Sequence, residues 1–335
     1  MSPQFVDFDA DGTLDMVAGI FDGSPHLARG TDKGHAPPEQ ILDRDGARIV
    51  MNAMWDFDSK PPKWVEQTRC DPEGGMLQRG HITSAWAFDW DADGDLDLLL
   101  GDHDHGQVML RRNEGKAGAP AFATRNEYVR VGEQPLVVKG TVTTLRTIDW
   151  DGDGLLDLLV GSMGDAYGGG EGGGVYVCRN AGAKGAPRFQ PPTVLIEPSA
   201  RGHKDAVRPD TGLYMDAADL DGDSDLDLVV GGYSTWTPEP PALDDMQKAR
   251  VAELQKQIAG LDEESQRYFE ALREATKGLD DEAYTKAYAE FQKGEAGTAR
   301  SARQKRQQTL REELEPLVPG MKRQSFTWYY ENLAK

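Results

Sequence analysis

Short apolar runs follow one another along the first 240 residues, and turn residues separate them. Four of these runs end in glycine, at residues 14–19, 96–101, 156–161 and 226–231. A short β-like run precedes each of them, at residues 5–6, 85–88, 145–148 and 213–218. Apolar runs of this length, bounded by turn residues, are typical of strands rather than helices. The pattern therefore predicts four pairs of antiparallel strands.

A third β-like run and a shared turn follow two of these pairs. The runs are residues 108–110 and 175–177, and each leads into a ten-residue turn, 113–122 or 180–189, that shares Asn, two Gly, Gly-Ala-Pro and Phe. We expect this turn to connect a third strand to a fourth. The repeating unit is then a four-stranded meander. Such units around an axis form a β-propeller, so we predict an all-β fold of about four recognisable four-stranded blades, with room for more in the intact protein.

One acidic loop lies between the first two strands of every unit. Its pattern is Asp-x-Asp-x-Asp-x-x-x-Asp, starting at residues 7, 89, 149 and 219, with Gly at the sixth position in three of the four copies. At about 5 Å and an effective dielectric near 20, two such carboxylates repel each other by roughly 3 kcal/mol. We therefore expect a bound cation to offset the repulsion.

The donor atoms of the loop indicate which cation it would hold. All are oxygen, with no His or Cys in the set, which favours calcium over zinc or copper. An EF-hand is excluded because its twelfth position must be a bidentate Glu, and the residues here are Ala18, Leu100, Val160 and Val230. The alternative is an Asp-rich turn without metal, which four copies at the same strand junction disfavour. The fourth copy is the weakest, because Ser224 replaces the glycine.

These loops, the apolar strands ending in Gly and the Asn-x-Gly-x-x-Gly-Ala-Pro-x-Phe turns resemble the FG-GAP/VCBS repeat family, known from the propeller of integrin α chains and from bacterial exported proteins. The resemblance covers residues 1–240 and 324–332. It implies a calcium-stapled propeller, usually extracellular or periplasmic, used for binding or adhesion, with up to four Ca²⁺. The side-chain ligands that it implies are Asp7, Asp9, Asp11, Asp15, Asp89, Asp91, Asp93, Asp97, Asp149, Asp151, Asp153, Asp157, Asp219, Asp221, Asp223 and Asp227, and the carbonyl ligands are Thr13, Asp95, Leu155 and Asp225.

The sequence pattern changes from strand-like to helix-like over residues 243–318. Apolar residues from Val251 to Leu279 recur at intervals of three and four positions. This spacing predicts amphipathic helices or a coiled-coil seam. Trp328-Tyr329-Tyr330 and Asn332 then align with the third strand of the preceding unit. We therefore predict blades over 1–242, a helical hairpin over 243–318 inserted in the last blade, and a closing strand within 319–335. A separate C-terminal helical domain is the alternative. A second insertion, 51–80, is interpreted as a loop.

The amino-acid composition excludes some classes of function. Lys+Arg number 37 and Asp+Glu 57, giving a net charge of -20, which is the wrong sign for binding nucleic acid or an anionic membrane surface. Mean hydropathy is -0.60, and we expect no transmembrane segment. No leader follows Met1, so we expect either a protein that is not exported or a chain lacking its own beginning. Whether Cys70 and Cys178 pair is left open.

The loops opposite the acidic ones carry most of the variation, and we predict that they form the interaction face. Its candidate ligand residues are Trp55, Trp64, His103, His105, Tyr167, His203 and Trp236. A solvated hairpin tip and apolar edge cover are the alternatives for these side chains. No nucleophile elbow, zinc-protease helix or dinucleotide fingerprint occurs. We favour a non-enzymatic binding or adhesion scaffold for a protein or glycan. The alternatives are a carbohydrate-binding or carbohydrate-active propeller, and self-association through the 243–318 helices.

Overall fold

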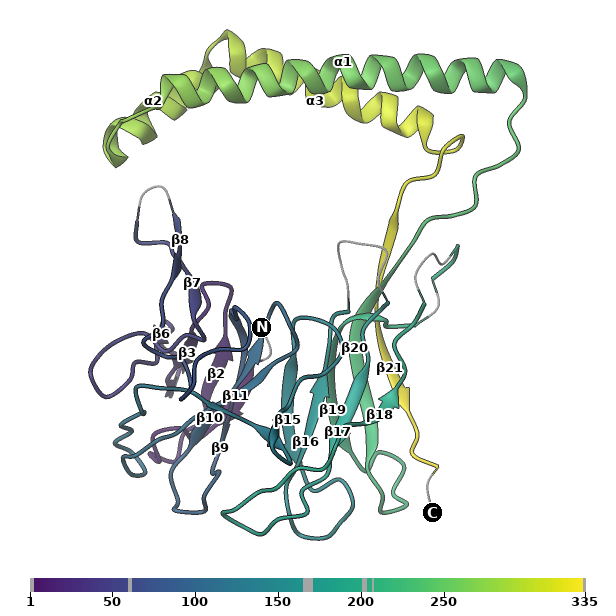
Figure 1. Cartoon of the computed structure of the whole chain (residues 1–335). Helices are drawn as coiled ribbons and strands as arrows, with labels where there is room; N and C mark the ends of the chain where they lie inside the picture. Colours follow the sequence, from purple (N-terminus) through teal and green to yellow (C-terminus); the bar gives the residue numbers. More distant parts are fainter. Residues whose placement is uncertain (1–2, 60–61, 165–170, 201–203, 207, 334–335) are drawn as a thin grey trace. The chain divides into compact units, whose positions relative to one another are not determined.

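The computed structural model describes residues 3–59, 62–164, 171–200, 204–206 and 208–333 (Figure 1). The chain divides into two compact units. The first comprises Met1–Gly202, Ala206–Thr235 and Arg323–Lys335, and the second comprises His203–Asp205 and Trp236–Lys322. We call them the sheet unit and the helical unit.

Four antiparallel sheets of the sheet unit carry the four repeats, in chain order. Their strands are, in spatial order, β1 (Gln4–Val6), β2 (Asp15–Gly19), β3 (Pro25–Ala28) and β6 (Glu39–Gln40); β9 (Ile82–Phe88), β10 (Asp97–Asp102), β11 (Val108–Arg111) and β12 (Glu127–Tyr128); β15 (Thr144–Ile148), β16 (Asp157–Gly161), β17 (Val175–Cys178) and β18 (Thr193–Ile196); and β19 (Thr211–Ala218), β20 (Asp227–Trp236) and β21 (Lys322–Tyr330). The fourth sheet has three strands among the described residues.

Three further sheets are two-stranded: β4 (Gly30–Thr31) with β5 (Gly34–His35), β7 (Ala53–Asp56) with β8 (Lys63–Glu66), and β13 (Arg130–Val131) with β14 (Gln134–Pro135). The prediction of a β-rich repeat fold is therefore confirmed. No closed propeller ring is detected in the described part of the chain, and the number of blades stays a prediction.

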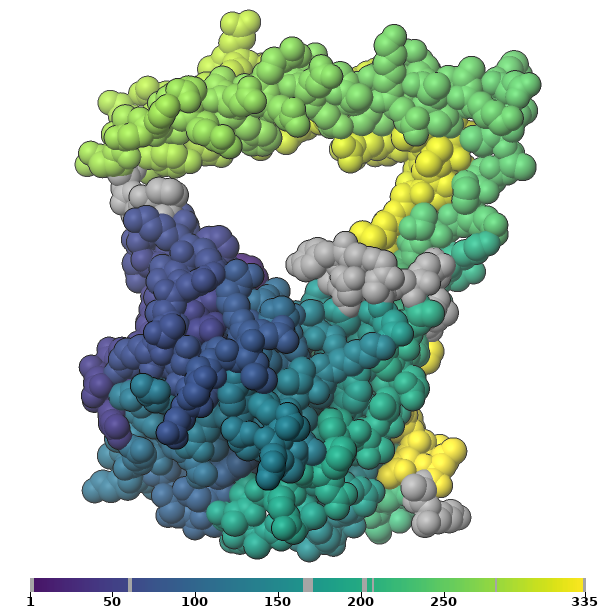
Figure 2. Space-filling model, viewed as in Figure 1, coloured from purple at the N-terminus to yellow at the C-terminus, as the bar shows by residue number. Residues whose placement is uncertain are grey.

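Apolar cores lie between consecutive sheets. Leu98 and Leu100 belong to the core that β10 shares with the first sheet, whereas Leu99 belongs to the core shared with the third sheet. In the same way Leu159 belongs to the core between the third and fourth sheets. Because side chains alternate between the two faces of a strand, a strand between two sheets must be apolar throughout. In the space-filling view the four sheets form one continuous packed body (Figure 2).

In the first three repeats the glycine at the end of the apolar run lies against the backbone of the next sheet. A Cβ at Gly19 would meet Ser84 N at 2.5 Å, one at Gly101 would meet Thr143 O at 2.5 Å, and one at Gly161 would meet Leu213 O at 2.4 Å. These residues are glycine because only a hydrogen atom fits there. Gly231 is the equivalent glycine of the fourth repeat, inside β20, and its Cβ would meet only Tyr214 O, at 3.8 Å.

The 51–80 insertion differs from the predicted loop, because it contains the β7–β8 hairpin. Trp55 lies directly opposite Trp64 in this hairpin, and their ring centroids are 5.3 Å apart. Such a cross-strand aromatic pair stabilises a hairpin. Asp56 closes the turn by accepting hydrogen bonds from the backbone N–H groups of Asp58 and Ser59.

The two cysteines, Cys70 and Cys178, are both buried and form no disulfide with each other.

The helical unit contains α1 (Asp245–Ala275), α2 (Asp281–Lys293) and α3 (Glu295–Leu314), which lie in the chain between β20 and β21. Asp244 caps α1 in a capping box with Gln247, an arrangement that satisfies two end donors. None of the described helices is long and apolar enough to cross a membrane.

We predict opposite outcomes for one substitution at two equivalent glycines. Gly161→Ala should destabilise the protein by about 1–3 kcal/mol, because the new methyl group overlaps the Leu213 carbonyl. Gly231→Ala should be neutral or stabilising by about 0.4–1 kcal/mol, because it restricts the unfolded chain without a clash. Urea unfolding of both variants measures the difference. Equal losses would contradict the role given to sheet packing.

Candidate metal centres

The four acidic loops join the first and second strands of the four sheets. In each loop three carboxylates gather, each contributing an oxygen, so that the oxygens lie within 4.8 Å of one another. The clusters are Asp7, Asp9 and Asp15; Asp89, Asp91 and Asp93; Asp149, Asp151 and Asp153; and Asp219, Asp221 and Asp223. The structure thus brings together the first, third and fifth aspartates of three loops, while in the first loop Asp15 takes the place of Asp11.

Two left-handed residues in every loop produce this clustering. The fourth positions are Ala10, Ala92, Gly152 and Gly222, with φ of 57, 59, 72 and 85°, and the sixth positions are Gly12, Gly94, Gly154 and Ser224, with φ of 87, 95, 87 and 78°. A left-handed conformation costs a residue with a Cβ roughly 1–2 kcal/mol. The sequence pattern indicated the sixth position only. It did not indicate the fourth position, because two of the four repeats have alanine there instead of glycine.

The ninth aspartate of each loop has a different environment from the other three. Asp15, Asp97, Asp157 and Asp227 are each 1% exposed. Each accepts a hydrogen bond at 3.1 Å from the backbone N–H at the second position of its own loop. Each also accepts one at 2.6–2.9 Å from a backbone N–H just after the third strand: Gly30, Asn113, Asn180 or Asn332. The ninth carboxylate therefore ties the loop to the third strand.

Burial and repulsion both act on carboxylates of these loops. Burial raises the pKa of Asp97 to about 7 and also raises the pKa of Asp157. The pKa of Asp95 is raised to about 6, by burial and then by the negative charges of Asp93 and its neighbours. The backbone N–H of Asn332 lowers the pKa of Asp227. Holding these groups close together therefore has an electrostatic cost that a cation would remove.

Several carboxylate oxygens in the loops are buried without a hydrogen-bond partner among the described residues. They are Oδ1 of Asp9, Asp89, Asp149 and Asp225, and both oxygens of Asp95. A buried acceptor left unpaired costs about 1–3 kcal/mol. Asp9, Asp89 and Asp149 belong to the clusters described above, and a cluster that offers only oxygen donors fits a hard divalent cation such as calcium.

An arginine after the third strand compensates the acidic loop in three repeats. Arg29 pairs with Asp9, Arg112 with Asp91 at 2.9 Å, and Arg179 with Asp151 at 2.7 Å. The equivalent position of the fourth repeat is Glu331, immediately before Asn332. The fourth loop therefore lacks this positive charge. The sequence analysis missed the arginines, although their place directly before Gly30, Asn113 and Asn180 is a repeated signal.

An aromatic cluster forms at the opposite strand ends of the first two sheets. The ring of Trp64 lies 5.2 Å from that of His81, and His81 lies 5.4 Å from both Phe21 and His103. The guanidinium of Arg79 stands 5.5 Å from the Trp64 ring. We call Phe21, Trp55, Trp64, His81 and His103 the aromatic cluster. Phe21 and His81 were missed, because nothing in their local sequence links them to Trp64.

A rigid turn presents the histidine side of this cluster. Asp102 is fully buried and accepts hydrogen bonds from the backbone N–H groups of His81, Asp104 and His105, at 2.9–3.1 Å. His103 Nδ1 lies 2.9 Å from Asp104 Oδ1. Burial lowers the pKa of His81 and so favours the neutral imidazole. A neutral ring packs against the neighbouring aromatic rings without the cost of burying a charge.

Two further predicted ligand residues, His105 and Trp236, are described by the structure. His105 follows on the same turn as His103. Trp236 ends β20 and belongs to the helical unit. Tyr167 and His203 lie outside the described residues.

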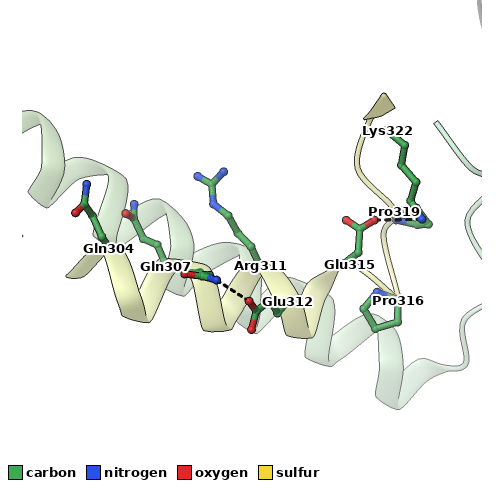
Figure 3. Close-up of a pocket in the computed structure, with 9 residues that line it drawn as sticks. Gln304, Gln307, Arg311, Glu312, Glu315, Pro316, Pro319 and Lys322 are labelled. Atoms are coloured by element: carbon green, nitrogen blue, oxygen red, sulfur yellow. Dashed lines mark hydrogen bonds and ion pairs between the residues drawn. The ribbon is translucent and has the colours of Figure 1, made fainter. Parts of the chain in front are cut away.

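The helical unit contains a surface hollow of about 790 Å³ along the end of α3. Figure 3 shows that Gln304, Gln307 and Arg311 line it from α3, with Glu315 turned toward Lys322. Glu315 Oε1 and Lys322 Nζ are 3.9 Å apart. All the lining side chains are exposed or half-buried.

The repeated sheets and acidic loops define a class of β-repeat protein with one acidic loop per repeat. A comparison with protein-family models matches residues 89–160 and 149–230 to the FG-GAP-like repeat. Residues 89–230 therefore match FG-GAP-like repeats, as the sequence predicts for this part of the chain, and the resemblance of the remaining residues stays a prediction. Comparisons with curated proteins and with solved structures found no match.

We predict that the sixth position sets loop stability through backbone conformation. Ser224→Gly should stabilise the protein by about 1 kcal/mol, because Ser224 has a φ of 78°. Gly154→Ser should cost about the same, because a Cβ at Gly154 meets no atom within 4 Å and only the φ of 87° opposes it. Thermal unfolding in chelator tests both, since no metal then contributes. A destabilised Ser224→Gly variant would contradict the explanation.

Proposed function

We propose that the chain is a calcium-stabilised, propeller-type binding scaffold that works outside the cytoplasm, in the extracellular space or periplasm. FG-GAP repeats are typical of extracellular proteins, and the repeats suggest a binding role. The observation that carries the calcium assignment is the clustering of three carboxylate oxygens in each of four equivalent loops, with an unpaired buried oxygen on Asp9, Asp89 and Asp149 of the first three. Calcium would supply charge neutralisation at these turns and so hold the first strand pair of each sheet in place.

The proposed ligands are the clustered aspartates of each loop, joined by the carbonyls of Thr13, Asp95, Leu155 and Asp225. The ninth aspartates already have two backbone partners each. Asp97, Asp157 and Asp227, which lie outside the three-carboxylate clusters, would therefore contribute mainly by fixing the loop, whereas Asp15 would also be a ligand. The fourth loop has neither the arginine nor the glycine of its equivalents, so its conformation would depend most on the ion.

Calcium should raise the melting temperature of this protein, and a chelator should lower it. A site occupied at a hundredfold excess over its dissociation constant adds about 2.7 kcal/mol. Asp153→Asn should reduce the calcium-dependent shift and remove one bound ion in titration calorimetry. Asp32→Asn, which changes an exposed carboxylate outside the loops, is the matched control. Identical melting with calcium and with chelator would refute the proposal.

We place the ligand face at the aromatic cluster, on the strand ends away from the acidic loops. Aromatic rings beside a fixed carboxylate and imidazole provide apolar area with polar edges, the combination that binding sites use. Phe21 is 48% exposed at the margin of the cluster. A protein or glycan partner bound there would not compete with calcium binding by the acidic loops at the other strand ends.

A carbohydrate-binding or carbohydrate-active propeller is the second candidate, and the Trp55–Trp64 pair favours it. Sugar rings present C–H faces that stack on indole, while their hydroxyls need polar groups such as those of Asp104, Glu66 and Arg79 nearby. Trp64 Nε1 donates to Glu66 Oε1 at 3.2 Å, and Arg79 Nη1 also reaches Glu66.

A glycan array separates the two candidates. Binding that Trp64→Ala reduces by tenfold or more, and that Tyr284→Ala on the helical unit leaves unchanged, would support a sugar ligand at the aromatic cluster. Release of reducing ends from a bound polysaccharide would establish an enzyme instead of a scaffold. Capture of a protein partner that is lost only in the Trp64 variant would support the first candidate.

A further inference from the structure

The turns that follow the third strands of the second and third repeats each lie against the acidic loop of the preceding repeat. We call these turns, residues 113–122 and 180–189, the bridging turns. A Cβ at Gly118 would lie 2.8 Å from the carbonyl oxygen of Asp9, and one at Gly185 would lie 2.4 Å from that of Asp91. A side chain has no room at either position, and glycine lets the backbone of the turn touch the third residue of the loop.

Aromatic side chains extend this contact between turn and loop. The second residue of the loop packs on the phenylalanine that ends the bridging turn. Phe8 packs on Phe122 with ring centroids 6.2 Å apart, and Trp90 packs on Phe189 at 6.0 Å. Both phenylalanines of the turns are at most 3% exposed. A bridging turn therefore contacts the second and third residues of the loop before it, next to the left-handed fourth residue that makes the carboxylates converge.

The same turns are fastened to the acidic loop of their own repeat. Asn113 Oδ1 accepts hydrogen bonds from the backbone N–H groups of Gly115 and Ala121, which closes the first bridging turn. Asn113 Nδ2 donates to the Leu96 carbonyl at 3.3 Å, and its backbone N–H donates to the ninth aspartate, Asp97, at 2.6 Å. The third repeat has the same four bonds, formed by Asn180 with Gly182, Arg188, Leu156 and Asp157. Each bridging turn is therefore bonded to one acidic loop and packed on another.

The first three acidic loops, residues 7–15, 89–97 and 149–157, thus form a series in which each neighbouring pair shares one turn. A hollow of about 420 Å³ marks one such meeting point, and its lining includes Ala92 of the second loop, Leu155 of the third and Lys184 of the turn. Closing a loop around a cation fixes the backbone positions against which the turn packs. Ordering one loop therefore reduces the conformational entropy that its neighbour must lose when it orders.

We propose that the bridging turns position the cation sites of the preceding repeats and make cation binding by the first three loops cooperative. This inference rests on the calcium function proposed above and adds a coupling between its sites. Gly118 and Gly185 would act through the loop backbone and not as ligands. Such a coupling is reciprocal, so that each site changes the affinity of the other by the same factor, typically about 5- to 150-fold. Charge repulsion between two bound cations alone has the opposite sign.

Three glycine amides report on these loops one by one. Gly12, Gly94 and Gly154 each donate a backbone hydrogen bond to the first aspartate of their own loop, at 3.0, 3.3 and 3.0 Å. A cation bound to that carboxylate changes the hydrogen bond and so shifts the amide resonance. Titrating calcium into the full chain, labelled with nitrogen-15 glycine, therefore gives one midpoint for each loop, and Gly94 reports on the second.

Removing the third site tests the coupling without altering a bridging turn. Asp153→Asn should raise the calcium midpoint of Gly94 by about fivefold or more, because the third loop no longer orders the turn. Asp32→Asn, which changes an exposed carboxylate outside the loops, should leave that midpoint unchanged. A Gly94 midpoint that is unchanged or lowered in Asp153→Asn would overturn the coupling and leave the calcium function standing. A Gly94 resonance that calcium does not shift in the unmodified chain would refute the calcium function, and the coupling with it.

Substituting the glycine of a turn tests the contact itself. Gly185→Ala should raise the Gly94 midpoint by about fivefold or more, because the new methyl group overlaps the Asp91 carbonyl. Gly132→Ala is the matched control, since it places alanine at a φ of 60° with no atom within 4 Å of the Cβ, and it should leave the midpoint unchanged. In the Gly185→Ala chain, Asp153→Asn should no longer move the Gly94 midpoint, which a merely structural role of the turn would not produce. An equal effect of Asp153→Asn in both backgrounds would overturn the route through the turn.

Discussion

One buried carboxylate holds each repeat together. The ninth aspartate of the loop accepts a hydrogen bond from its own loop and another from the residue after the third strand, with nearly the same distances in all four repeats. These two bonds connect segments that the strand ladders do not connect. Because they fix where the loop closes, they also bring its other aspartates together. The repulsion within the loop follows from this geometry.

Several other features of each repeat reduce or accommodate that repulsion between the aspartates. Three repeats use an arginine at the end of the third strand, and all use left-handed residues that let the turn be tight. Hydrogen bonds to backbone N–H groups help the ninth carboxylate, which is otherwise desolvated. None of these devices satisfies the orphaned oxygens of Asp9, Asp89 and Asp149, and this is the observation on which the calcium proposal rests.

The sequence was informative wherever structure depends on local spacing. The apolar runs that end in glycine indicated the second strands, and the aspartate pattern located every acidic loop. It was uninformative where a residue's role depends on a distant neighbour. Phe21 and His81 join the aromatic cluster only because the first two sheets pack together. Trp55 and Trp64 lie opposite each other only because the hairpin closes, and Ala10 shows its left-handed φ only in the folded turn.

The position of the helices in the chain has a consequence for how such a protein can vary. They leave from the end of β20 and return at the start of β21, and these two strands are paired neighbours. Paired strands lie about 4.7–4.9 Å apart, so any inserted module must begin and end at almost the same point. The antiparallel course of α1 and α3 meets that demand. The junction is therefore a natural graft site, at which one appendage could be exchanged for another while the sheets keep their register.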